Sequence, residues 1–418
     1  MSLRNKPAYL KEAVQPFDSR TAMEEAARCL LCHDAPCSKA CPAGTDPASF
    51  IMSLRFRNEK GAADTIRSAN PLGGVCARVC PYDRLCEEAC SRCGIDRPIE
   101  IGRLQGYATD QESVYGMTVM EPAAGIGRSA VCIGAGPASL SCAAFLAQSG
   151  VAVTVYEKKE KAGGLLTYGI LPARLSQETV DRELAHFEKL GIRFVFGKEV
   201  GKDVSLSDLR SQFDAVFIGT GLGAAKTLDI PGVDLKGVVS ALDFLEEARR
   251  TDGHPAVGKN VVVIGGGDVA MDAASTAALL GARTTIVYRR TLEEAPANTR
   301  EIEFTQSLGV GFALQFRPES IEGRDGAAAL LHAVGTDGES RLTLKADQVI
   351  LAIGQENDCD LGEGIAVDEK KLIRTENGKT SVEGIFAGGD VTNGGKTVVQ
   401  AVADGKMAAF SMLNYLRR

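Results

Sequence analysis

The residues with the most distinctive chemistry are cysteines, because nine of the twelve in this 418-residue chain lie before residue 94. They form two runs, C-x2-C-x4-C-x3-C-P and C-x3-C-P-x4-C-x3-C, followed by one more cysteine. These cysteines are Cys29, Cys32, Cys37 and Cys41, then Cys76, Cys80, Cys86 and Cys90, and finally Cys93. Ferredoxin-type sites combine a short run of three thiolates with a fourth cysteine that precedes proline and ligates the other cluster. Because each iron of a cubane cluster takes one soft anionic donor, the spacing predicts iron–sulfur clusters.

Other uses of these cysteines have to be weighed. Structural zinc also uses C-x2-C pairs, although such a site normally has two pairs per ion. Disulfides are disfavoured in a reducing compartment. Two clusters of four ligands need eight donors, so at least one of the nine cysteines is spare. The remaining Cys132, Cys142 and Cys359 are expected to pack or to lie in loops, and His33 beside Cys32 is a candidate for a hydrogen bond to a cluster.

A first glycine turn follows an apolar strand at residues 130–133. Gly134 and Gly136 allow a tight turn and a close approach to a pyrophosphate at a helix N-terminus. The third position of the fingerprint is Ser139 instead of glycine. Glu157 ends the next strand, where the fingerprint has an acid that binds a ribose. The alternative is that Glu157 only ends a strand at the surface.

A second glycine turn follows the apolar strand at residues 261–264, about 130 residues after the first, and has the G-x-G-x-x-A form. The residues of this turn are candidates for contact with a second dinucleotide: Gly265, Gly267, Asp268, Val269 and Ala270. Its next strand ends at Arg289 and Arg290 instead of an acid, which favours a 2′-phosphate and hence NADPH. The alternative is a solvated pair of surface arginines.

A third glycine-rich segment lies near the C-terminus. Asp390 ends the run GIFAGGD, and a helix is predicted to begin at Thr397 and Val398. An aspartate in this position can hold the ribityl hydroxyls of a flavin, and the helix N-terminus would stabilise negative charge on the reduced ring. Because only Cys359 follows Cys142, a dithiol beside the flavin is not expected. Electrons would leave instead through the N-terminal clusters.

The elements that position these residues change in kind along the chain. Before residues 115–128 the pattern is helical, with helix starts predicted at Thr21 with Glu24 and at Asp46-Pro47. Afterwards strands, glycine turns and helices alternate, which predicts an α/β fold with an N-terminal all-helical domain followed by two Rossmann-like domains. The predicted domains are a cluster domain at 1–125, an FAD domain at 126–235 and 355–418, and an inserted NAD(P) domain at 236–354.

Composition excludes several classes of protein. The net charge of −7 argues against a nucleic-acid-binding surface. No apolar run approaches the roughly 18 residues of a membrane span. The polar start of the chain lacks the apolar core of a secretory signal, so we expect a cytoplasmic protein.

The segments CLLCHDAPCSKACP, GGVCARVCPYDRLCEEAC and PIEIGRLQGYATD resemble the family of the glutamate synthase small subunit and the N-terminal half of dihydropyrimidine dehydrogenase. The resemblance covers essentially the whole chain. The spacing of five residues between Cys80 and Cys86 is similar to the spacing in the dihydropyrimidine dehydrogenase branch, here called the pyrimidine branch. In that branch a glutamine after an I-G-x-L-Q motif is a cluster ligand, and Gln105 matches it. The resemblance implies two [4Fe-4S] clusters, one on Cys29, Cys32, Cys37 and Cys90, the other on Cys41, Cys80, Cys86 and Gln105.

The resemblance also implies contacts with FAD. In the family, Gly164 and Leu165 lie against the FAD, and Arg174 lies in the loop that follows. Asp390, Thr397 and Val398 map onto positions that contact the ribityl chain and the pyrimidine edge of the flavin ring. Bacterial relatives are associated with NADH, whereas the arginine pair resembles users of NADPH, so NAD(P) stays open.

The chain length limits the function that the resemblance implies. Pyrimidine reduction in this family uses an FMN-bearing barrel, which takes roughly 250 residues, and none remain here. The resemblance therefore implies an electron-input subunit that passes electrons from NAD(P)H through FAD and two clusters to an FMN- and iron–sulfur-containing barrel subunit, as a heterotetramer that reduces uracil or thymine. One alternative is another acceptor, such as a glutamate synthase large subunit or a ferredoxin. The other is a redox sensor that turns over slowly. No residue of this chain is singled out as a catalytic acid or base.

Overall fold

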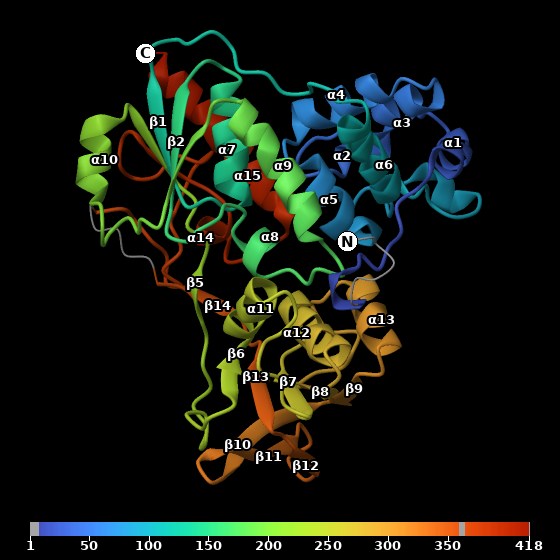
Figure 1. The fold of residues 1–418 in the computed structure, drawn as a ribbon, viewed down its shortest axis with the longest axis vertical. Coiled ribbons are helices and arrows are strands. Elements are labelled where there is room, and N and C mark those ends of the chain that lie inside the picture. Colours follow the sequence, from blue (N-terminus) through green and yellow to red (C-terminus); the bar gives the residue numbers. More distant parts are fainter. Residues whose placement is uncertain (1–7, 359–363, 418) are drawn as a thin grey trace. The chain divides into compact units, whose positions relative to one another are not determined.

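The structure is a computed structural model that describes residues 8–358 and 364–417. These residues fall into two compact units. The main unit consists of 14–166, 177–223, 357–358 and 364–417, and the inserted unit of 8–13, 167–176 and 224–356. Figure 1 shows the elements of both.

The N-terminal part of the main unit is helical, as predicted. Its helices are α1 (Ser19–Ala27), α2 (Pro36–Lys39), α3 (Pro47–Arg55), α4 (Glu59–Ala69), α5 (Gly73–Val79) and α6 (Ile101–Val114), with short 3-10 turns η3 (Tyr82–Arg84) and η4 (Ser91–Gly94). Asp46 caps α3 with Pro47 in its first turn, as the sequence indicates. The predicted start of the first helix was wrong, because Asp18 caps α1 and Thr21 bonds back to it, which leaves Glu24 without a capping role.

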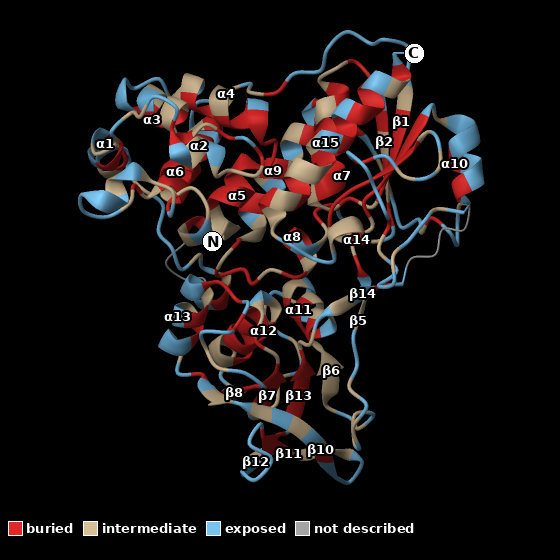
Figure 2. Ribbon diagram, turned by 180° about the vertical axis from the view of Figure 1, so that it is seen from behind, coloured by how far each residue is buried: buried red, intermediate tan, exposed pale blue. Residues whose placement is uncertain are grey.

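The rest of the main unit is a parallel sheet in the order β15-β4-β1-β2-β3, covered by helices. Its strands are β1 (Ser129–Ile133), β2 (Ala152–Glu157), β3 (Arg193–Phe196), β4 (Ala215–Ile218) and β15 (Ile385–Ala387). Its helices are α7 (Pro137–Ala147), α9 (Gln177–Lys189), α10 (Leu206–Gln212), α14 (Asp390–Asn393) and α15 (Val398–Leu416), and α8 (Leu165–Tyr168) lies at the boundary of the two units. Figure 2 shows that β1 and α7 are largely buried.

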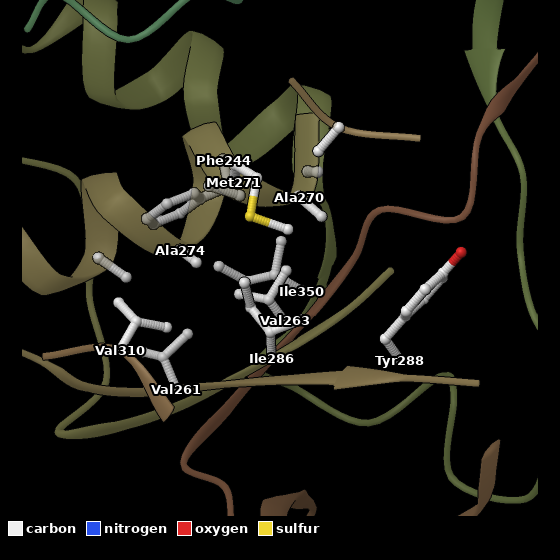
Figure 3. Packing of buried hydrophobic residues seen from close by; sticks show 14 of the residues in the cluster. Phe244, Val261, Val263, Ala270, Met271, Ala274, Ile286, Tyr288, Val310 and Ile350 are labelled. Atoms are coloured by element: carbon white, nitrogen blue, oxygen red, sulfur yellow. The ribbon is translucent and has the colours of Figure 1, made fainter. Parts of the chain in front are cut away.

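The inserted unit repeats this design with the parallel order β6-β13-β7-β8-β9. Its elements are β6 (Val238–Ser240), α11 (Ala241–Arg250), β7 (Asn260–Ile264), α12 (Asp268–Leu279), β8 (Arg283–Tyr288), α13 (Thr299–Ser307), β9 (Gly311–Leu314) and β13 (Gln348–Leu351). In its core, Met271 and Ala274 of α12 pack over Val263, Ile286 and Ile350 of the sheet (Figure 3). Since apolar strands here read as continuous runs, the sheet is buried on both faces.

A small antiparallel sheet continues the inserted unit. It consists of β10 (Phe316–Arg324), β11 (Ala327–Gly335) and β12 (Arg341–Lys345), which pair in this order. Where the chain passes between the units, β5 (Gly223–Ala225) pairs with β14 (Gln355–Asn357). No helix in the described residues is both long enough and apolar enough to cross a membrane.

The compact units divide the chain differently from the three predicted domains. Residues 8–13 and 167–176 group with the inserted unit, although the sequence places them in the helical and flavin segments. Tyr9, in the turn η2 (Ala8–Leu10), packs with Leu171, Ala173 and Ala248 and is 2% exposed. An apolar anchor of one or two residues carries too little periodicity to be recognised in a sequence.

Candidate cofactor sites

The first group of thiols lies around the loop that follows α1. Burial raises the pKa of the Cys29 thiol, and the nearby Cys90 and Cys32 act in the same direction. Burial also raises the pKa of Cys37 to about 11, and the nearby Cys90 and Cys29 act in the same direction. The structure thus brings Cys90, which is distant in sequence, within electrostatic reach of Cys29 and Cys37, while Cys32 acts on Cys29.

The second group of thiols lies at the C-terminal end of α5. A hydrogen bond to Cys76, followed by burial, raises the pKa of the Cys80 thiol, and Cys86 and Cys41 add to the effect. Burial raises the pKa of Cys86 as well, with Glu87, Cys41 and then Cys37 contributing. Cys41, Cys80 and Cys86 are therefore neighbours, and Cys76 lies beside them.

Gln105 is buried on α6, which packs against α5. Its Nε2 donates to the carbonyl oxygen of Gly73 at 2.7 Å, which orients the side-chain amide. Its Oε1 has no hydrogen-bond partner among the described residues. A fourth donor for the second thiol group can therefore come from Gln105, as the resemblance implies, or from the neighbouring Cys76.

The chemistry of these donors fits iron–sulfur clusters. All cysteines in the described part of the chain are free thiols, and those of both groups are half-buried apart from the fully buried Cys76. Because clusters bind thiolates, and burial raises the pKa of Cys29, Cys37 and Cys86, cluster binding must displace protons from these thiols. Cys93 is exposed, and its Sγ lies 3.4 Å from the carbonyl oxygen of Glu87.

The first glycine turn is shaped by its backbone. Gly134 has φ +88°, and a Cβ there would lie 2.6 Å from the carbonyl oxygen of Gly219. Gly136 caps α7 without a side-chain hydrogen bond, and no atom lies near its potential Cβ. The first N–H groups of α7 are thus available to an anionic ligand.

Glu157 holds this turn in place. It is 8% exposed and therefore does not simply end a strand at the surface. Its Oε2 accepts a hydrogen bond from Ala135 N at 2.8 Å, and its Oε1 accepts one from Lys159 N at 2.9 Å. Each carboxylate oxygen can accept a further hydrogen bond, so a ribose can still bind.

A cavity of about 280 Å³ opens beside this turn. Gly134 and Glu157 line it together with Lys158, Lys198 and Lys202 from the loops after β2 and β3. Thr220 also lines it, and its buried Oγ1 has no hydrogen-bond partner among the described residues. Glu199 and Asp358 also line the cavity, and Lys158 and Lys202 lie 3.5 Å and 3.8 Å from carboxylate oxygens of Glu199. The unpartnered hydroxyl and the lysine ammonium groups are donors that suit the adenosine diphosphate part of a dinucleotide. These lysines could not be recognised from the sequence, because they lie on irregular loops.

The remaining flavin candidates are placed in different ways. Gly164 has φ +55°, and a Cβ there would lie 3.0 Å from Cα of Gly136, so the segment 163–165 closes on the glycine turn. Leu165 is 38% exposed. Arg174 belongs to the inserted unit, where its Nη1 donates to Asp272 at 2.9 Å and its Nε lies 2.8 Å from Glu301 Oε1. A contact between Arg174 and FAD therefore stays a prediction.

The C-terminal candidates lie at two helix starts. Burial raises the pKa of Asp390, whose Oδ1 accepts a hydrogen bond from Lys396 N at 3.3 Å. Thr397 caps α15, its Oγ1 accepting from Gln400 N at 3.3 Å, and Val398 is the first residue of the helix. The positive end of this long helix suits a group that gains negative charge.

The second glycine turn has its own geometry. Gly265 has φ +147°, and a Cβ there would lie 2.2 Å from the carbonyl oxygen of Ala352. Gly267 caps α12 without a side-chain hydrogen bond, and Asp268 accepts from Asn298 N at 2.8 Å. Ala270 is fully buried and Val269 half-buried.

Arg289 and Arg290 directly follow β8, and both are exposed. Their position suits a cationic contact with a nucleotide. Exposure equally allows a solvated pair, so their role stays a prediction.

A buried ion network also lies in the main unit. Arg67 of α4 pairs with Glu112 of α6 and Glu183 of α9, and His186 lies 3.0 Å from Glu112. Glu112, Glu183 and His186 are close enough to ligate a metal. Because the Arg67 guanidinium donates hydrogen bonds to both carboxylates, and Glu183 also accepts from the backbone N–H groups of Gly74 and Val75, we interpret the group as a buried ion network. It links α4 and α6 of the N-terminal helices to α9, which belongs to the sheet-containing part of the main unit.

Family models match the two parts of the chain. The model described as pyridine nucleotide-disulphide oxidoreductase matches residues 128–405, and the model described as dihydropyrimidine dehydrogenase domain II, 4Fe-4S cluster, matches residues 6–117. The chain therefore belongs to the pyridine nucleotide-disulphide oxidoreductase family. It is an oxidoreductase of the NAD(P)H-dependent flavin class with a 4Fe-4S domain.

Curated relatives extend over nearly the whole chain. It is 44% identical to the NAD-dependent dihydropyrimidine dehydrogenase subunit PreT of Escherichia coli K12 over 98% of this chain and 97% of that protein. It is 34% identical to the glutamate synthase [NADPH] small chain of Halomonas elongata over 99% and 94%. The resemblance to the dihydropyrimidine dehydrogenase branch is thus confirmed.

Solved structures share the fold of the flavin and nicotinamide parts. Mycobacterium tuberculosis FprA in complex with NADPH is 19% identical with a TM-score of 0.58, covering 69% of this chain and 85% of that one. T. acidophilum thioredoxin reductase is 23% identical with a TM-score of 0.56, covering 69% of this chain and 99% of that one. These likenesses confirm the predicted Rossmann-type architecture.

Proposed function

We propose that this chain is the electron-input subunit of a dihydropyrimidine dehydrogenase. It would oxidise NAD(P)H at FAD and deliver electrons through two [4Fe-4S] clusters to a separate subunit that reduces uracil or thymine. The observation that carries the proposal is that both thiol groups and the flavin-type turn belong to one compact unit. The identity of 44% to a protein named as such a subunit supports the choice of acceptor.

Each cofactor has residues that suit it. Gly134, Gly136 and Glu157 would hold the FAD diphosphate and ribose, and the turn at Gly265 and Gly267 would hold NAD(P)H. When bound, the flavin takes a hydride and releases its electrons singly, the form that iron–sulfur clusters accept. Predicted domains 1–125, 126–235 with 355–418, and 236–354 would hold clusters, FAD and NAD(P), respectively.

The ligand sets follow the two thiol groups. We assign Cys29, Cys32, Cys37 and Cys90 to one cluster, and Cys41, Cys80, Cys86 and Gln105 to the other. The way in which the thiols neighbour one another in the structure supports this division. Cys132 of β1 and Cys142 of α7 are fully buried, which disfavours an exchange of electrons through a dithiol there. Cys359 lies outside the described residues.

The partner would be a barrel subunit of the PreA-like type that carries FMN and its own iron–sulfur clusters, in a heterotetramer in the cytoplasm. A reducing compartment suits thiol ligands. A second candidate is a subunit that feeds a different acceptor, as in glutamate synthase. The identity of 34% to a small chain of that enzyme and the exposed Arg289 and Arg290 favour this candidate.

The test starts with the chain purified without oxygen. We expect FAD, about eight iron and eight sulfide per chain, and rapid dye reduction with NADH or NADPH. With the barrel subunit added, uracil should be reduced; reduction of uracil by this chain alone would contradict the division of labour. Negligible dye reduction with both nucleotides would favour a sensor, and zinc in place of iron would exclude the clusters.

A further inference from the structure

Lys406 is a cation of α15 that lies against the cysteine loop. Its Nζ donates to the carbonyl oxygens of Ala43, two residues after Cys41, at 3.0 Å and of Ala69, at the end of α4, at 3.2 Å. The Nζ also lies 5.3 Å from the centre of the Phe145 ring. Lys406 is half-buried and has no carboxylate partner among the described residues.

The simplest role for this lysine is to clamp two segments of backbone together. A neutral donor could make the same hydrogen bonds without the cost of withdrawing a charge from water. Burial lowers the pKa of Lys406, and Cys41 acts in the opposite direction, which places Cys41 within reach of the ammonium charge. A charge without an acidic partner, beside a proposed cluster ligand, indicates a role for the charge itself.

The helix connects this lysine to the flavin-type site. Lys406 is eight residues after Val398, the first residue of α15, so it lies roughly 12 Å along the helix from Val398, at about 1.5 Å per residue. One rigid element therefore carries a candidate flavin contact at its N-terminus and a cation at the second thiol group. Electrons that pass from flavin to clusters would meet this cluster beside α15.

We propose that the Lys406 ammonium raises the reduction potential of the cluster held by Cys41, Cys80, Cys86 and Gln105, an inference that rests on the proposed function. Uptake of one electron adds one negative charge to a cluster, and a nearby fixed cation in a half-buried environment stabilises that charge. The lysine is a positioning and tuning residue for electron transfer. It makes this cluster the more favourable acceptor on the side of α15.

The experiment is a reductive titration of the anaerobic full chain, followed by electron paramagnetic resonance. We expect Lys406→Met to lower the potential of one cluster, with about a tenfold smaller equilibrium constant for its reduction, or about 59 mV for a one-electron couple. The other cluster should keep its potential. Lys406→Arg, which keeps the charge, should restore the wild-type value. Lys60→Met is the matched control, since Lys60 is an exposed lysine of α4 paired with Asp64.

The outcomes separate the inference from the proposed function. Unchanged reduction potentials in a Lys406→Met chain with full iron and sulfide content would overturn the tuning role. Lys406 would then only hold two backbone segments together through its hydrogen bonds to Ala43 and Ala69. If the Lys406→Met chain does not assemble its clusters, the measurement is made on Lys406→Gln, which can still donate a hydrogen bond. We expect the same decrease in the reduction potential of one cluster. A wild-type chain that holds no iron or sulfide would overturn the proposed function itself, and the inference with it.

Discussion

At the first glycine turn the chain leaves β1 through Gly134, and at the second it leaves β7 through Gly265. Both glycines have positive φ, and a Cβ at either would meet a backbone carbonyl oxygen. The following strands end differently, at the buried Glu157 in one case and at the exposed Arg289 and Arg290 in the other. The repeated unit thus keeps its backbone turn, while the residues after its second strand assign different ligands to the two sites.

The second difference concerns the surroundings of the acidic side chains near the two glycine turns. The turn in the inserted unit has a buried acidic cluster, in which Arg174 faces Asp272 and Glu301, with Asp268 nearby. The buried acid of the first turn, Glu157, instead accepts hydrogen bonds from backbone N–H groups. Burial and the neighbouring acids raise the pKa of Glu301, so we expect the cluster of the inserted unit to respond to pH.

The largest effect should come from the shared backbone of the turns. Gly134→Ala combines a positive φ with the contact to Gly219, so we expect a loss of at least about 2 kcal/mol in the free energy of unfolding and loss of FAD. Gly136→Ala has room for its Cβ and should change stability by less than about 0.5 kcal/mol while still weakening FAD. Denaturant unfolding and flavin absorbance measure both. Equal stability of the two variants would contradict this account of the turn.

The next effect concerns the acid that distinguishes the first turn. Glu157→Gln replaces a carboxylate that accepts two backbone hydrogen bonds, which should weaken FAD binding by about 1.5–3 kcal/mol, or roughly tenfold to a hundredfold. Titration of the apoprotein with FAD measures the affinity. Glu160→Gln, at an exposed position nearby, is the control. An unchanged affinity for FAD in Glu157→Gln would show that Glu157 stabilises the turn and does not contribute to FAD binding.

The acidic cluster of the inserted unit should make its stability depend on pH. Burial, with Asp272 and Asp268, raises the pKa of Glu301 from 4.5 to about 7 against the lowering effect of Arg174. The folded chain then binds more protons than the unfolded chain between these values, so its free energy of unfolding falls as pH rises from 4.5 to 7, by on the order of 1–2 kcal/mol.

Glu301→Gln should flatten this dependence in denaturant titrations at pH 5, 6, 7 and 8. Glu303→Gln, exposed on the same helix, should leave it unchanged. A stability that rises with pH in the wild-type chain, and not in Glu301→Gln, would show that the ion pair with Arg174 outweighs burial.

The smallest effect is expected at the exposed arginines. Arg289→Ala with Arg290→Ala should raise KM for NADPH about tenfold, or about 1.4 kcal/mol, and leave KM for NADH within about twofold. Dye-reduction kinetics with both nucleotides measure the difference. Arg283→Ala, exposed at the start of β8, is the matched control. If the KM for neither nucleotide changes, the two arginines are solvated surface residues, and the second glycine turn binds its ligand without them.

Elements that depend on a few consecutive residues were predicted well from the sequence. The packing of single residues against distant segments was not. The strands at 130–133 and 261–264, the turns after them and the helix start at Asp46 follow from local preferences that a few consecutive residues express. The start of α1 was placed too late, because Asp18 lies outside the apolar pattern that was used to find it. The association of Tyr9 with the inserted unit had no local signal, since it depends on residues more than 160 positions away.

The sequence by itself determined the kinds of chemistry in this protein. Thiol donors at close spacing, two glycine turns after buried strands, and an acid or an arginine pair after the next strand are all encoded within a few tens of residues. Only the tertiary structure decided which thiols are neighbours, that Arg174 pairs with Asp272 and Glu301, and that Lys406 lies beside the cysteine loop. The physical reason is range: a turn is set by local φ and ψ angles, whereas the surroundings of a buried charge are set by whichever distant segments pack around it.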